Sequence, residues 1–145
     1  MNGVQRWLNL AAIRNPLKAT PHTRIPVGDR LRAWGPAAAW AGVLFFLSAI
    51  PGKHVPSLSL PGEDKFAHLA LYAIFGAALA WGWVRSARER SALPILALGV
   101  LYAVSDEWHQ TFVPGRDPSL ADLLTDTAGV LLGYWLFSFV RRHLE

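Results

Sequence analysis

The chain has 145 residues, of which 52% are hydrophobic and 17% are charged, against about 25% charged in a typical globular protein. It contains seven Trp and no Cys, which excludes a disulfide framework and a Cys-ligated zinc site. The net charge of +4 does not indicate a nucleic-acid-binding protein, because the basic residues flank apolar segments. In that position they orient a membrane protein and meet anionic lipid headgroups.

The first 32 residues form a basic segment that we expect to lie in the cytoplasm. It is too long for a cleavable signal peptide, and Pro16, Pro21 and Pro26 interrupt it. Residues 4–14 place apolar side chains at helical spacing. This pattern is equally consistent with a helix on the inner leaflet and with a disordered tail.

Four apolar segments follow, which we expect to be membrane-spanning helices. They occupy residues 33–50, 66–84, 91–104 and 120–140. The third reaches the roughly 20 residues of a span only if it continues through residues 105–110. A soluble four-helix bundle is the alternative, but its helices would carry a polar face along their whole length. Here the polar residues gather at one end of each segment, so residues 33–142 are predicted to form an all-α, integral membrane four-helix bundle.

The distribution of Lys and Arg predicts the orientation of these spans. Eleven of the 14 lie in the first 32 residues, in the connector 85–90 or in the tail after residue 140. The other three are Lys53, Lys65 and Arg116. The positive-inside rule therefore places both termini in the cytoplasm, with the connections at 51–65 and 111–119 on the outer face.

With this topology, polar residues from three helices meet at the outer face. In the second span, Asp64, His68 and Tyr72 recur at i, i+4 and i+8 and so share one helical face. Asp126 follows Asp122 by one helical turn in the fourth span, and Gly129 and Gly133 continue that face with a spacing that predicts close helix packing. The expected site residues are Asp64, Lys65, His68, Tyr72, Asp106, Glu107, His109, Gln110, Arg116, Asp122 and Asp126.

Several of these residues also have a structural interpretation. Asp64 fits the cap of a helix N-terminus, and Lys65 and Glu107 fit solvated charges at the rim. Five residues are harder to explain in this way: His68, Asp106, His109, Asp122 and Asp126. A carboxylate placed in a bilayer alone costs roughly 2.5–3.5 kcal/mol. Such residues usually face the bundle interior and mark a functional site, although a purely structural network remains the alternative.

Two stretches resemble the VanZ-like family: "DKFAHLALYAIFG" (64–76) and "SDEWHQTFVPGRDPSLADLLTDTAGVLLG" (105–133). The resemblance covers residues 33–140 and implies a small, multi-pass protein of the bacterial cytoplasmic membrane. The founding member is associated with resistance to teicoplanin, a glycopeptide antibiotic, and the resemblance supplies no settled activity. Position 126, often Asn in the family, is Asp in this chain.

The first functional hypothesis is an enzyme acting on a lipid-linked or headgroup substrate at the outer face. His68 or His109 would serve as acid, base or nucleophile, oriented by Asp106 or Asp122. The carboxylates of Asp106, Asp122 and Asp126 complete the expected catalytic group. Substrate binding is assigned to Asp64, Lys65, Tyr72, Glu107, Gln110 and Arg116, with the two cations holding phosphate or carboxylate.

Two other hypotheses use the same residues. A non-catalytic protein would bind an envelope lipid, a wall precursor or a partner protein in the same cleft. A proton relay is the weakest hypothesis, because no ionisable residue continues the path toward the cytoplasm. A shared metal ion is conceivable on His and Asp at helical spacing, but the spacing matches no specific metal motif. We therefore expect no metal, no cofactor and no nucleic acid, and membrane lipids or lipid-linked molecules as partners.

Overall fold

The structure, a computed structural model, describes residues 27–54, 62–86 and 91–144. Its elements are α2 (Val27–Ser48), the 3₁₀ turn η1 (Gly52–His54), α3 (Glu63–Arg85), α4 (Leu93–Gln110) and α5 (Leu120–Leu144). These residues contain four α-helices and no strand, which confirms the all-α prediction. The expectations for residues 4–14 and for most of the basic segment fall outside the described residues.

The helix boundaries lie within three residues of the predicted segments except at two places: α2 begins six residues before its segment, and α5 ends four residues after its segment. α2 begins at Val27, with Asp29 in its first turn, whereas the apolar segment begins at residue 33. An acidic residue stabilises a helix N-terminus, so the helix continues beyond the apolar run. α4 does extend through residues 105–110, as its length required, and only residues 111–119 separate it from α5.

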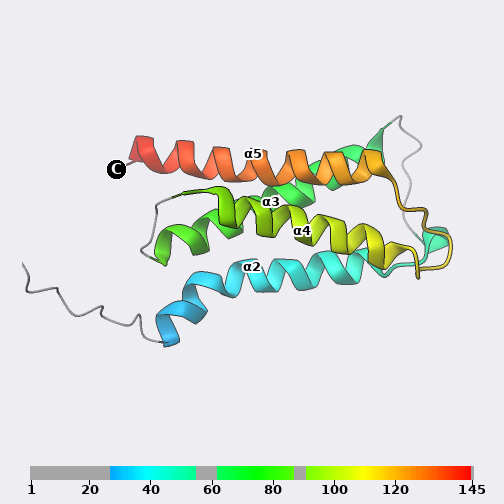
Figure 1. The fold of residues 1–145 in the computed structure, drawn as a ribbon, viewed down its shortest axis with the longest axis horizontal. Coiled ribbons are helices and arrows are strands. Elements are labelled where there is room, and N and C mark those ends of the chain that lie inside the picture. The colour runs from blue at the N-terminus through cyan, green and yellow to red at the C-terminus, as the bar shows by residue number, and fades with distance from the viewer. Residues whose placement is uncertain (1–26, 55–61, 87–90, 145) are drawn as a thin grey trace, which may run out of the picture.

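The four helices lie side by side along one long axis (Figure 1). α2 begins and α5 ends at the same end of the bundle. The opposite end holds the end of α2, the start of α3 and the residues that join α4 to α5. This second end is where the predicted site residues of α3, α4 and α5 gather, and we call it the site end.

α3 and α5 form the closest helix pair because glycines remove the side chains between their backbones. A Cβ on Gly133 would lie 1.8 Å from the carbonyl oxygen of Ala73, and one on Gly76 would lie 2.2 Å from that of Val130. Gly129 is similarly close to Leu69. Small residues at such spacing allow close approach of membrane helices, and the predicted packing role of Gly129 and Gly133 is confirmed.

Aromatic side chains fasten α2 to its neighbours. The indole nitrogen of Trp40 donates a hydrogen bond of 2.9 Å to the carbonyl of Leu71 on α3. The Tyr102 hydroxyl of α4 donates one of 2.5 Å to the carbonyl of Ala41. These bonds satisfy the polar atoms of side chains that otherwise pack in an apolar interior. These two bonds hold α2 against α3 and α4.

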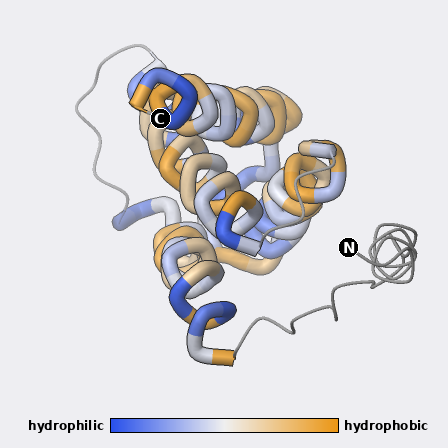
Figure 2. Tube along the Cα trace, turned by 90° about the vertical axis from the view of Figure 1, so that its left-hand side faces the viewer, coloured by the Kyte–Doolittle hydropathy of each residue, from blue (hydrophilic) through white to orange (hydrophobic). Residues whose placement is uncertain are grey.

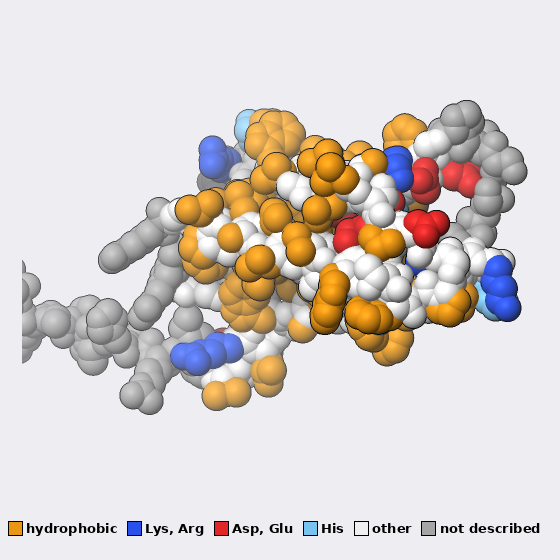
Figure 3. Space-filling model, turned by 45° about the vertical axis from the view of Figure 1, so that its right-hand side comes forward, with side chains coloured by type: hydrophobic (Ala, Val, Ile, Leu, Met, Phe, Trp, Pro, Cys, Tyr) orange, Lys and Arg blue, Asp and Glu red, His pale blue; other side chains and the backbone are white. Residues whose placement is uncertain are grey.

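The outer surface of the bundle is apolar along its middle. Two helices, α3 and α5, are long and apolar enough to cross a membrane, yet only 33% and 22% of their apolar windows are buried. A core helix of a soluble protein would be mostly buried. Hydrophobic turns lie on the periphery as well as in the interior (Figure 2), and hydrophobic side chains cover the middle of the face in Figure 3. Exposed apolar surface of this extent is typical of helices that pack against lipid.

Candidate functional site

The loop between α4 and α5 is fastened to the end of α2 and closes the site end. The amide of Gly52 donates a hydrogen bond of 3.1 Å to the carbonyl of Pro114. Arg116 donates from Nε to the carbonyl of Ile50 (3.1 Å) and from Nη2 to that of Leu47 (3.2 Å). The Arg116 guanidinium, expected to hold an anion, thus also bonds the Leu47 carbonyl in the last turn of α2 and the Ile50 carbonyl just beyond it.

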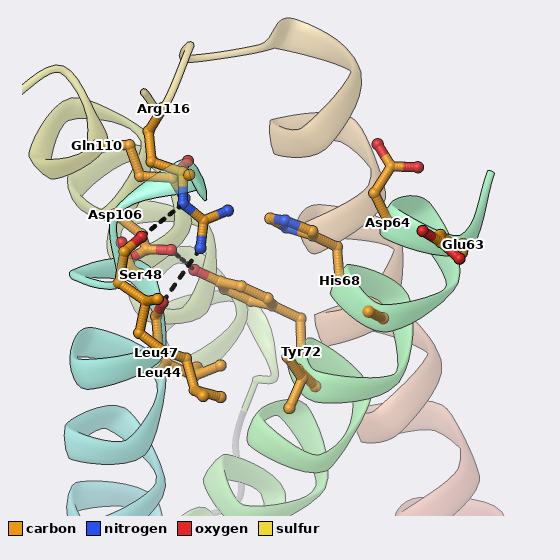
Figure 4. A pocket seen from close by; sticks show the side chains of 14 residues that line it. Leu44, Leu47, Ser48, Glu63, Asp64, His68, Tyr72, Asp106, Gln110 and Arg116 are labelled. Atoms are coloured by element: carbon orange, nitrogen blue, oxygen red, sulfur yellow. Dashed lines mark hydrogen bonds between the residues drawn. The ribbon is translucent and has the colours of Figure 1, made fainter. Parts of the chain in front are cut away.

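A cavity of about 640 Å³ opens at this end between α2 and α3. One part of its wall is apolar and includes Leu44, Leu47, Ile50 and Leu71. The polar part includes Ser48, His68, Tyr72, Asp106, Gln110 and Arg116. In Figure 4, His68 and Tyr72 project from α3 toward Asp106, Ser48 and Arg116 on the far side, and Asp64 lies at the rim. The cavity is therefore amphipathic.

The floor of the cavity contains a buried hydrogen bond between α3 and α4. The Tyr72 hydroxyl donates to Oδ2 of Asp106 at 3.0 Å, and both side chains are buried. Asp106, expected to orient a histidine, bonds Tyr72 instead. Nearby, the hydroxyl of Ser48 is buried without a hydrogen-bond partner. Because buried polar groups nearly always find a partner, Ser48 is a candidate contact for a bound molecule.

Sequence reasoning missed Ser48. The sequence contained one sign of it, because Ser48 is a polar residue that interrupts a run of large apolar residues. In the structure it is the last residue of α2. Nothing in the sequence, however, placed the end of that run beside Asp106 of α4.

His68 forms the second buried contact, with α5. Its Nδ1 lies 2.8 Å from Oδ1 of Asp126, whose side chain is completely buried. His68 itself retains 18% exposure and borders the cavity. The second oxygen of Asp126 has no hydrogen-bond partner. Asp126 is therefore the carboxylate that orients His68, in the position expected of Asp106 or Asp122.

Lys65 and Glu107 both connect to the start of α5. Lys65 donates to Asp122 and, at 2.8 Å, to Asp64, so two carboxylates share its charge. Glu107 accepts the amide of Ser119 at 2.8 Å, and its other oxygen is unpartnered. Glu107 is only 7% exposed, so its interpretation as a solvated rim charge is wrong.

His109 lies apart from these contacts. Its ring stacks on Phe45 with centroids 4.7 Å apart, and it borders a smaller pocket with Tyr102 and Trp108. The large cavity includes Gln110 but not His109 in its wall. The structure thus brings His68 together with the buried carboxylates and the cavity, and leaves His109 on another face of α4.

Comparison with known proteins finds a match over the helical part of the chain. The family model described as VanZ/LLP1 matches residues 33–141, which include all four helices except the first turns of α2 and the last turn of α5. The chain belongs to the VanZ/LLP1 family. The predicted resemblance is thereby confirmed. Membership of the VanZ/LLP1 family and the two membrane-capable helices together indicate a membrane protein.

The VanZ/LLP1 chain is also similar to an uncharacterised protein of Schizosaccharomyces pombe. The two are 30% identical over 104 residues, which are 71% of this chain and 64% of the relative. The match therefore spans less than two thirds of the relative's length. No solved structure matches the chain.

The arrangement offers two kinds of chemistry. The cavity can hold a molecule that has both apolar and polar parts, because its wall has both. His68 can exchange a proton with such a molecule, and Asp126 can stabilise the charged imidazole.

Proposed function

We propose that this chain is a four-span membrane protein whose cavity receives the headgroup of a lipid or of a lipid-linked molecule, and that His68 acts on the bound headgroup. The observation that carries the proposal is the amphipathic cavity of about 640 Å³ at one end of the bundle. That volume is typical of small-molecule sites, which measure about 300–1,000 Å³.

The membrane topology in this proposal rests on helix length and charge. α4 has 18 residues, and a helix of that length extends about 27 Å, close to the roughly 30 Å of a hydrocarbon core. Arg30, Arg32, Arg85, Arg141 and Arg142 belong to the end at which α2 begins and α5 ends. We place that end in the cytoplasm by the positive-inside rule. The cavity then faces the extracytoplasmic side.

The position of the cavity favours an amphiphile over a water-soluble ligand. Its apolar wall lies on α2 and α3, whose outer surfaces are themselves apolar, so an acyl chain can remain in lipid while its headgroup enters. Ser48, Gln110 and Arg116 offer hydrogen bonds to the headgroup. His68 is the histidine of the cavity wall, and its partner Asp126 is a buried carboxylate, which supports its role as acid or base.

As part of this proposal, membership of the family supports a link to teicoplanin-type resistance. The protein would contribute to resistance by changing a headgroup in the bacterial cell envelope. The relative in Schizosaccharomyces pombe favours one source of that headgroup. Schizosaccharomyces pombe is a fungus, and its cell wall contains no peptidoglycan. A membrane lipid is therefore a substrate available to both proteins, whereas a peptidoglycan precursor is not.

The test is to fill the cavity. Ala67 borders it on α3, and Ala70, also exposed, lies on the same helix outside its wall. We expect Ala67→Trp to abolish the copurification of a specific lipid seen by native mass spectrometry with the wild type. Ala70→Trp adds the same side chain and is expected to retain that lipid.

Two results would contradict the proposal. One is a wild-type protein that carries only the average lipid composition of its membrane. The other is a specific lipid retained equally by Ala67→Trp and Ala70→Trp. Retention of the lipid with no chemical change after incubation would leave a binding protein and remove the catalytic part of the proposal.

A further inference from the structure

We propose that His68, Glu107 and Asp126 together bind one divalent metal ion beside the cavity. The three residues come from α3, α4 and α5, respectively. One potential ligand atom from each lies within 4.8 Å of the other two. Residues that are 39 and 19 positions apart along the chain thus converge on one point between three helices.

Unpartnered atoms within this group indicate a missing ligand. Asp126 Oδ2 and Glu107 Oε1 are both buried and have no hydrogen-bond partner. Their side chains are also among the least exposed charged groups of the described residues, at 0% and 7%. A buried carboxylate oxygen without a partner costs about 1–3 kcal/mol or more. Both acids of the possible ligand group thus keep a buried oxygen without a partner, which a bound cation would satisfy.

The charge around the group also favours a cation. His68 can neutralise one of the two buried carboxylates when it is protonated, but not both. Lys65 is already shared by Asp64 and Asp122, and Arg116 is bonded to carbonyl groups of α2. Figure 3 shows acidic side chains gathered toward the site end. A divalent ion would compensate the negative charge that remains on the buried carboxylates.

The other polar contacts of the two acids suit them to be ligands. Asp126 uses Oδ1 for His68 and Glu107 uses Oε2 for the Ser119 amide, so each keeps one oxygen free. Hydrogen bonds of this kind hold metal ligands in position. Ligands at about 2.0–2.2 Å from an ion lie about 3.4 Å apart, so atoms that lie within 4.8 Å of one another need to approach by at most about 1.4 Å.

The donor set narrows the choice of ion. One imidazole and two carboxylates suit zinc or manganese, whereas soft copper(I) prefers sulfur ligands and the described residues contain none in this group. Three protein ligands leave at least one position open on such an ion. His68 borders the cavity, so the ion would lie next to a bound headgroup.

The role of the ion rests on the proposed function, but its binding does not. Carboxylates alone would repel a phosphate-bearing headgroup, and the two fixed cations nearby already have partners. With the ion bound, His68 would be a ligand and no longer an acid or base, and the ion would polarise the phosphate in its place. Ion binding can be measured on lipid-free protein, so failure of either proposal can be recognised separately.

The experiment measures metal in the full-length protein, purified with an affinity tag that contains no histidine. We expect about one zinc or manganese ion per chain by elemental analysis, or saturable binding of one equivalent by titration calorimetry with either metal alone. Glu107→Gln and Asp126→Asn are expected to weaken binding by about 10–100-fold or more. Asp117→Asn removes the same charge from an exposed residue of the same end and is expected to bind normally.

A proton shared between Glu107 and Asp126 is the competing explanation of the buried acids. It predicts a folded wild-type protein that neither contains nor binds zinc or manganese, and that result would overturn the proposal. Equal binding by the wild type and both acid variants would overturn it as well. Circular dichroism establishes that each variant is folded, and the wild-type titration decides the question even if a variant is not.

Discussion

His68 is the residue at which the cavity and the buried acids of this protein meet. It borders the cavity from α3 and contacts Asp126 of α5 at 2.8 Å. His109, the other histidine of the predicted site, stacks on Phe45 outside the cavity wall. The two side chains therefore have different expected roles, although both lie among the same predicted site residues.

Exchange of each histidine for glutamine tests this difference. We expect His68→Gln to reduce conversion of the bound headgroup by at least about 100-fold, the scale of general acid–base catalysis, while lipid still copurifies. His109→Gln is expected to retain most of the activity. Mass spectrometry of a total lipid extract before and after incubation with the reconstituted protein measures both. The opposite order of effects would assign the chemistry to His109.

The sequence predicted which residues gather at the site end but not which of them pair. Helical spacing placed Asp64, His68 and Tyr72 on one face, and the structure keeps His68 and Tyr72 in the cavity wall. Each then bonds to a different helix, His68 to Asp126 and Tyr72 to Asp106. Partner choice depends on the rotation of each helix about its axis, which spacing within one helix does not determine.

At the scale of the helices, the α3–α5 contact fixes the depth of the site. Gly129 and Gly133 let the backbones of α3 and α5 approach. Asp126 lies about one turn before Gly129 on α5, so the same contact determines its position along α3. A shift of α5 along α3 would separate Asp126 from His68. The sequence predicted this packing from the glycine spacing alone, and it also predicted the extension of α4 through Gln110 from the length that a span needs.

Alanine at Gly133 tests the contact. The added Cβ would lie 1.8 Å from the carbonyl oxygen of Ala73, so the helices must separate. We expect the free energy of unfolding to fall by about 1–3 kcal/mol, as for other overpacked sites. Gly42→Ala is the matched control, because nothing lies within 4 Å of its Cβ. Thermal denaturation in detergent measures both, and equal stability of the two variants would argue against tight packing at Gly133.

For the whole molecule, polarity is arranged along the bundle axis. The middle is apolar, five of the six described arginines lie at the end where α2 begins and α5 ends, and Arg116 and most of the described acids lie at the site end. The start of α2 at Val27 was not predictable from apolar composition, because helix formation there continues past the apolar run into a charged turn. Hydropathy predicts only the apolar part of a helix, whereas the helix itself extends as far as its backbone hydrogen bonds continue.

The absence of Cys makes the topology directly testable. His54 and His143 are exposed residues at opposite ends of the bundle. With a membrane-impermeant maleimide, we expect His54→Cys to be labelled in intact cells and His143→Cys only after permeabilisation. Labelling of both from the same side would contradict the four-span topology, and the reversed pattern would contradict its orientation.

The most direct measurement of the central claim is an experimental structure of the protein purified with its native lipids. We expect density for a headgroup in the cavity, within hydrogen-bonding distance of the Ser48 hydroxyl and next to His68, with its acyl chains passing toward the membrane. A cavity that contains only water, or that closes when α2 moves against α3, would contradict it.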